Sequence, residues 1–133
     1  MAQLKPDAVK IFNIVTKASR ENKHYTAEEI ARFVFNREVD NADVRKINGI
    51  ITGAFINRKN LKGERTPVME RVKGEIEIED VDGRIFHKPV KFIEMTEYGL
   101  TQTVNSLDEE DNQKQLNKAA KKDAQKELSR KVV

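Results

Sequence analysis

The sequence predicts an α+β fold in which three helices come first, a β-hairpin follows, and a further helix ends the chain. Up to about residue 59, apolar residues recur at the three- and four-residue spacing of helices. After Gly63 they alternate with charged residues, which is typical of a half-buried strand. The dipeptide Asp82-Gly83 then marks the turn of a hairpin. These patterns place the helical half of the protein before its sheet.

The first two helices each have a recognisable start. Pro6 suits the first turn of a helix that we expect to reach about Glu21. The segment Thr26-Ala27-Glu28-Glu29 is a capping box and begins a second helix that ends near Asn36. The residues expected to face the core are Ala8, Ile11, Phe12, Val15 and Ala18 in the first helix, and Ile30, Phe33 and Val34 in the second.

A third helix is expected from Asn41, its N-cap, to about Arg58 or Lys59. Its apolar stripe consists of Val44, Ile47, Ile50, Ile51, Ala54 and Phe55. The opposite face carries Arg45, Gly49, Thr52, Gly53 and Ile56, flanked by Lys46, Asn48 and Lys59. Each glycine in an exposed helix costs about 1 kcal/mol relative to alanine. Close approach of another molecule to the helix backbone would explain them, and so would relief of crowding against the C-terminal helix.

The two strands of the predicted hairpin differ in charge. The outgoing strand places apolar residues at even positions and Glu75, Glu77 and Glu79 at odd ones, and the returning strand covers about residues 84–96. A two-residue turn would pair Glu77 with Lys88 but would put the returning apolar residues on the opposite face from Ile76 and Ile78. We therefore expect a three-residue loop or a bulge, with Pro89 as the irregular point.

The sequence becomes helical again after Tyr98-Gly99, and Ser106-Leu107-Asp108-Glu109 reads as a second capping box. We divide the chain into a domain over residues 1–104 and a charged C-terminal helix or partly disordered tail over residues 105–133. The tail begins with acidic residues and ends with basic ones, so two copies could pair antiparallel into a homodimer.

The composition excludes several classes of protein. The chain has 133 residues and no cysteine, so it contains neither disulfides nor thiolate metal sites, and it lacks an apolar run of the ~18 residues that cross a membrane. A cytoplasmic protein is expected. No nucleophile elbow, P-loop or dinucleotide loop occurs, and the two histidines, His24 and His87, lie far apart in sequence. We therefore predict no enzymatic activity, no metal and no cofactor.

Charge along the chain points to an anionic partner for the third helix. The whole chain carries a net charge of +3, but residues 44–73 contain eight basic and two acidic residues, a net +6. This basic stretch overlaps the third helix and the segment after it. Binding of DNA or RNA is the function that such a distribution favours.

Three segments resemble the winged helix-turn-helix regulators of bacteria and phages. Residues 25–31 (YTAEEIA) are similar to the entry of the helix before the recognition helix, and residues 43–51 (DVRKINGII) to the recognition helix itself. The segment Met95-Thr96-Glu97-Tyr98-Gly99 is similar to the Leu-Thr-Glu-X-Gly exit from the last strand of the wing. The resemblance covers roughly residues 6–107 and implies three helices followed by a β-hairpin wing.

The resemblance also implies a function and a site. The third helix would enter the major groove of double-stranded DNA, as in a regulator of transcription or of another DNA transaction. Arg45, Asn48 and Thr52 would read bases, and Gly49 and Gly53 would permit close docking. Phosphate contacts would come from Lys46, Arg58, Lys59 and Arg65.

The acidic hairpin favours a different partner. Its glutamates would repel phosphate groups, unless they pair with basic residues of the returning strand. The alternative function is a protein-interaction adaptor on the same scaffold, which uses the acidic hairpin or the C-terminal helix to bind a protein partner. RNA is a weaker candidate because the sequence offers no aromatic stacking platform.

Overall fold

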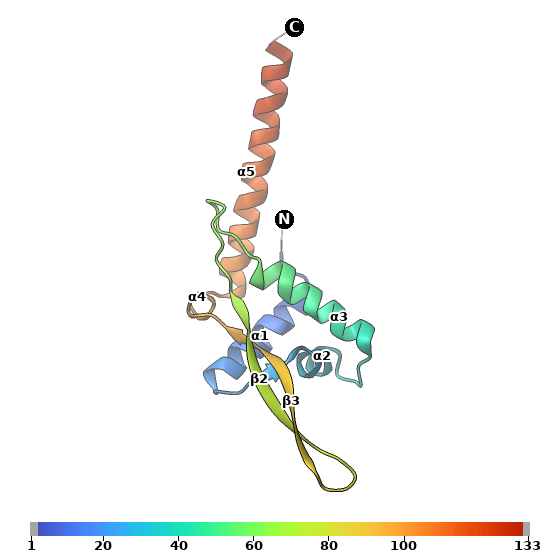
Figure 1. Ribbon diagram of the computed structural model, residues 1–133. Coiled ribbons are helices and arrows are strands. Elements are labelled where there is room, and N and C mark those ends of the chain that lie inside the picture. Colours follow the sequence, from blue (N-terminus) through green and yellow to red (C-terminus); the bar gives the residue numbers. More distant parts are fainter. Residues whose placement is uncertain (1–2, 132–133) are drawn as a thin grey trace.

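Within its described residues the protein is an α+β chain with five α-helices, a short π-helical turn and a small three-stranded antiparallel sheet. The computed structural model describes residues 3–131, and the side chains as far as Lys121. A helical body lies in the middle of the molecule, with the long hairpin extending from one side and the C-terminal helix from the other (Figure 1).

Helices α1 (Pro6–Arg20) and α2 (Ala27–Phe35) form where the sequence predicts them. The Thr26 hydroxyl accepts a hydrogen bond from the Glu29 amide, and the Glu29 carboxylate accepts one from the Thr26 amide, so the predicted capping box is confirmed. All five predicted core residues of α1 are buried. In α2, Ile30 and Val34 are buried, but the prediction for Phe33 is wrong, because its side chain is 55% exposed.

A two-residue strand, β1 (Tyr25–Thr26), lies between these helices and pairs with the last strand of the hairpin. This strand was not predicted, because two residues are too few to show an alternating pattern. This strand makes the hairpin the larger part of a sheet with the order β1-β3-β2.

The third helix is divided into α3 (Asn41–Ile50) and a π-helical turn, η1 (Ile51–Ile56), in which the amide of Asn57 donates to the carbonyl of Thr52. Its N-cap is Asp40, not Asn41 as predicted: the Asp40 carboxylate accepts from the amide of Asp43 at 2.8 Å, and Asp43 reciprocates at 3.1 Å. The predicted apolar stripe is confirmed, with Ile47, Ile51 and Phe55 fully buried and Val44, Ile50 and Ala54 partly buried.

The hairpin consists of β2 (Met69–Glu79) and β3 (Ile85–Met95) and turns through the three residues Val81, Asp82 and Gly83. The amide of Asp80 donates to the carbonyl of Arg84, and Gly83 has a φ of +79° that favours glycine. One of the two predicted alternatives, the three-residue loop, is therefore confirmed. It places Phe86 beside Ile78, on the same face.

Pro89 does not interrupt the hairpin, contrary to the prediction. It pairs with Glu75 within a continuous ladder. The amide of Asp80 bonds to Arg84, and hydrogen-bonded pairs alternate with non-bonded ones in an antiparallel ladder. Even-numbered residues of β2 and β3 therefore bond to each other, and the backbone nitrogen of the odd-numbered Pro89 points away from β2, to the open edge of β3. A proline at such a position removes no hydrogen bond from the sheet.

The chain ends with α4 (Glu97–Leu100) and α5 (Val104–Lys131). The second capping box is not at Ser106 to Glu109 as predicted, because Thr103 and Ser106 cap each other through reciprocal side-chain hydrogen bonds, and Ser106 lies inside the helix. Leu107 is fully buried in the core, so the first turns of α5 pack against the globular body, and the division of the chain after residue 104 stays a prediction. Residues 132–133 of the predicted tail lie outside the described residues. No helix among residues 3–131 is both long and apolar enough to cross a membrane.

Candidate nucleic-acid interface

The exposed side of α3 carries two basic side chains in different settings. Arg45 is exposed, and among the described residues it has no ion-pair partner. Lys46 is also exposed, but its ammonium group lies 3.5 Å from the Asp7 carboxylate and 5.6 Å from the centre of the Phe35 ring. Arg45 is therefore the basic residue of α3 whose charge is not paired within the described part of the protein and can bind a ligand.

Gly49 and Gly53 are one turn apart on this side of the helix. A Cβ atom added to either would meet nothing within 4 Å. The explanation by crowding against the C-terminal helix is therefore wrong. The helix backbone at these two glycines is open. Another molecule could therefore approach it more closely than it could if either position carried a side chain.

Arg71 of β2 extends the basic surface of α3. One of its guanidinium nitrogens donates to the Thr52 hydroxyl at 2.9 Å and to the Asn48 side-chain oxygen at 3.3 Å. The oxygen atoms of these two predicted base readers are thus already engaged. The amide nitrogen of Asn48 and the remaining N–H groups of Arg71 are available for a ligand.

Arg71 was counted among the basic residues of this stretch but was assigned no role. At the start of β2, Arg71 shares a face with the buried Met69, and this face lies against α3. Which helix Arg71 would meet depends on the packing of β2 after η1, and no local pattern predicts that packing.

Arg58 does not belong to this surface, although the sequence analysis placed it among the phosphate contacts. Its side chain is 4% exposed and lies between η1 and α5. The guanidinium group donates to the carboxylates of Glu110 and Asp111 and to the backbone carbonyl of Leu107. Buried and fully paired, Arg58 joins two helices.

The segment from Lys59 to Arg65 forms a compact basic loop beside α5 (Figure 1). The backbones of Lys59 and Arg65 pair in an isolated antiparallel β-bridge. The side-chain oxygen of Asn60 accepts hydrogen bonds from the backbone amides of Lys62 and Glu64. The ammonium group of Lys114 of α5 donates to the Lys59 carbonyl. These contacts fix the loop with its three basic side chains, those of Lys59, Lys62 and Arg65, exposed.

The acidic residues of the hairpin lie on the same sheet face as Arg71. The predicted pair of Glu77 with Lys88 does not form, because Glu77 pairs with His87 and Lys88 pairs with Ile76 on the other face. Between β2 and β3, the one described contact of an acidic with a basic side chain joins the carboxylate of Glu75 and Nδ1 of His87 at 3.8 Å, and both side chains are more than half exposed. The acids of β2 are therefore not neutralised by the basic residues of β3.

Neither histidine belongs to a metal site within the described residues. The imidazole of His24 contacts the carboxylate of Glu94 and packs against the Phe92 ring, at 5.7 Å between centroids. Among residues 3–121, whose side chains the structure describes, no group of three or more histidine, aspartate and glutamate side chains is arranged to hold a metal ion.

Comparison with protein-family models, with curated proteins and with solved structures found no match for this chain.

Proposed function

We propose that this chain is a non-enzymatic, winged-helix DNA-binding protein that regulates transcription or another DNA transaction, with α3 in the major groove. The observation that carries the proposal is the exposed side of α3, where Arg45 and Arg71 flank a helix turn whose two glycines face open space. A cationic surface with an uncovered helix backbone suits close contact with a groove edged by phosphates.

The order of elements supports the winged-helix interpretation. Helix α1, the short strand β1, helices α2 and α3 and then a hairpin follow one another, and β1 pairs with β3. In a winged helix the hairpin is the wing and the third helix is the recognition helix. The proposed wing projects well beyond the helices (Figure 1).

Each basic group has its own proposed role. Arg45 lies in the first half of α3, from which recognition helices reach base edges. Arg71 lies where the helix meets the hairpin, and we assign it to a phosphate at the edge of the groove. The basic loop from Lys59 to Arg65, at the other end of η1, would contact the next phosphates along the strand.

The test is a salt titration of binding to random-sequence duplex DNA, followed by selection of a preferred site. We expect affinity to fall steeply with salt. Arg71→Ala should weaken binding to all sequences and lower the salt slope by about one, whereas Arg45→Ala should also relax specificity at about one base pair. Arg20→Ala, which removes an exposed charge at the far end of α1, is the matched control and should bind like the wild type.

Two results would overturn the proposal. One is a lack of binding to duplex DNA even at low salt. The other is a loss of affinity in Arg20→Ala as large as in Arg45→Ala, because binding would then depend on overall charge and not on α3.

The adaptor function stays the second candidate, and one observation favours it. The hairpin end exposes four large apolar side chains, those of Ile78, Val81, Ile85 and Phe86, beside its unneutralised acids. An apolar and acidic projection suits a protein partner better than DNA. Capture of a specific protein by the intact chain, lost on replacing Phe86, would support this candidate over DNA binding.

The antiparallel homodimer through α5 also stays a prediction. Beyond Leu107, the described part of α5 exposes Leu116 with Ala119 and Ala120, which an equivalent helix could cover. Leu116→Lys should then halve the mass measured by sedimentation. An unchanged mass would contradict the pairing.

A further inference from the structure

The end of the hairpin is an apolar surface with an acidic border. Ile78 and Phe86 are register partners, Ile85 pairs with Glu79, and Val81 lies in the connecting loop. Ile85 is 61% exposed and Phe86 is 52% exposed. Residues 77–88 carry four acidic and two basic side chains. We name these four apolar residues and their acidic neighbours the hairpin tip.

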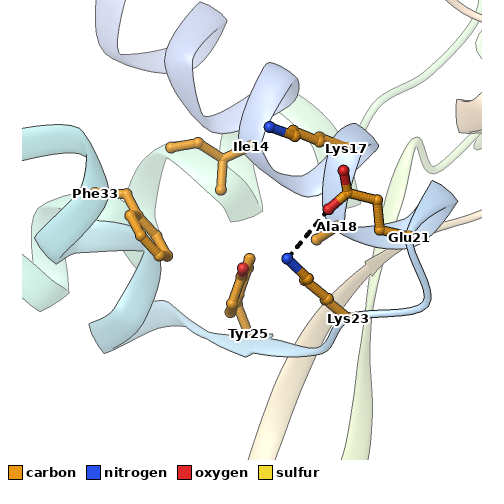
Figure 2. Close-up of a pocket in the computed structure, with 7 residues that line it drawn as sticks. All are labelled: Ile14, Lys17, Ala18, Glu21, Lys23, Tyr25 and Phe33. Carbon is orange, nitrogen blue, oxygen red and sulfur yellow. Dashed lines mark ion pairs between the residues drawn. The ribbon is translucent and has the colours of Figure 1, made fainter.

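A hollow of about 370 Å³ between the end of α1, β1 and α2 has the opposite character (Figure 2). Phe33 and Tyr25 form its aromatic wall with ring centroids 5.1 Å apart, and Ile14 lies beside them. Lys17, Lys23 and Glu21 form its rim, which carries a net charge of +1. We name this hollow the aromatic pocket.

Charge around the pocket complements that of the tip. Lys23 is paired with Glu21 at 3.3 Å, whereas Lys17 has no ion-pair partner among the described residues. Residues 17–23 carry three basic side chains and one acidic one. The pocket is therefore apolar inside and cationic at the rim, whereas the tip is apolar with an anionic border.

The tip does not reach the pocket of its own chain. Tyr25 of the pocket pairs with Ile93, eight residues along β3 from Ile85. At about 3.3 Å per residue, this separation is roughly 26 Å along a continuous strand. The hairpin projects away from the helices over that length (Figure 1). A hairpin tip that fills the aromatic pocket must therefore belong to a second copy of the chain.

We propose that the hairpin tip of one copy inserts into the aromatic pocket of another. Phe86 and Ile85 pack against Phe33 and Tyr25, and the acids of the tip approach Lys17. Because the contact joins two different surfaces, each copy keeps one free tip and one free pocket. The copies then add head to tail, into a ring or an open chain. None of the residues of the tip or of the pocket is among those assigned to DNA contact, so failure of this proposal would leave DNA binding untouched.

The experiment uses two complementary variants of the full chain in sedimentation velocity. Phe33→Glu blocks the pocket and Phe86→Glu blocks the tip, and both side chains are more than half exposed, so neither substitution disturbs the core. We expect the wild type to grow in mass with concentration, and the growth to diminish with salt. Each variant alone should associate more than roughly tenfold more weakly. An equimolar mixture should form a one-to-one complex, because it contains one intact tip and one intact pocket.

Each alternative gives a different result. If Phe33→Glu alone associates as strongly as the wild type, the tips pair with each other and the proposal is overturned. If the two variants stay monomeric when mixed, the tip does not bind the pocket and the proposal is overturned as well. If Leu116→Lys abolishes association and the phenylalanine variants do not, helix α5 is the interface and the proposal is again overturned. A wild type that stays monomeric at all concentrations also overturns it. If circular dichroism shows that either glutamate variant is misfolded, the mixture is repeated with Lys17→Glu and Ile85→Glu.

Discussion

The guanidinium group of Arg58 lies 2.8 Å from the carboxylate of Asp111, and this contact joins the end of η1 to the first turns of α5. The same group also donates to Glu110 and to the carbonyl of Leu107, whose side chain lies in the core. The long C-terminal helix is therefore anchored to the helical body at its beginning, while its remaining length extends beyond it (Figure 1).

Arg58→Ala should destabilise the protein without a direct effect on DNA. Removing one partner of a buried ion pair leaves the other charges uncompensated, and we expect the free energy of unfolding to fall by roughly 3 kcal/mol. Urea denaturation measures the change. Lys59→Ala, at the exposed neighbouring position, is the control and should change stability by less than about 0.5 kcal/mol. A variant that keeps its stability but loses DNA affinity would restore Arg58 to the binding surface.

Gly49→Ala should have opposite effects on folding and on binding. Alanine is the better helix former and a Cβ at this position meets nothing, so the free energy of unfolding should rise by about 0.5–1 kcal/mol. The added methyl group should hold a docked molecule away from the helix backbone and weaken DNA binding. Thermal denaturation and DNA titration of one preparation test both effects. Higher stability with unchanged affinity would show that the glycine serves no contact.

Local signals in the sequence predicted the helices well. The capping box at Thr26 and the spacing of the apolar residues in α1 involve residues within one or two turns of each other. Such contacts are determined before any tertiary packing occurs. The three-residue loop was one of the two predicted alternatives, since either this loop or a bulge puts the apolar residues of both strands on one face.

Two of the errors arose where distant segments meet. Phe33 has the spacing of a core residue, but α1 and β1 leave a hollow beside it, so its ring lies against Tyr25 at the surface. Arg58 lies in a basic stretch, yet acids 52 and 53 residues further along the chain neutralise it. Neither the hollow nor the ion pairs could be inferred from one sequence, since both depend on how helices pack.

Gly99→Ala should strongly destabilise the fold. A Cβ at this position would lie 2.0 Å from the carbonyl oxygen of Val68. That oxygen also accepts a hydrogen bond from the backbone amide of Thr96. The backbone would have to move, and this overpacking should lower the free energy of unfolding by about 2 kcal/mol or more. Gly63→Asn, at an exposed turn, serves as the control in the same denaturation assay, since asparagine tolerates the positive φ of this position. Equal stability of Gly99→Ala and the wild type would contradict the close approach of α4 to Val68.

Asp43 should make the stability of the protein depend on pH in the acid range. Its carboxylate accepts two hydrogen bonds from the Arg37 guanidinium, at 2.7 and 3.1 Å, and one from the amide of Asp40. These bonds, led by those from Arg37, lower the pKa of Asp43 from 3.8 to about 2. Because the folded state holds the proton less tightly than the unfolded chain, this contribution to stability is fully present above about pH 4. It is lost as the pH falls toward about 2.

Urea denaturation between pH 2 and pH 6 tests this expectation. The wild type should be more stable than Asp43→Asn above about pH 4, and the difference should shrink as the pH approaches 2, where the carboxyl group is protonated in the unfolded state and about half protonated in the folded one. Glu38→Gln removes a neighbouring exposed carboxylate that has no ion pair among the described residues, and it should follow the wild type across the range. A constant difference between Asp43→Asn and the wild type would mean that the cap is stabilised by the shape of the side chain and not by its charge.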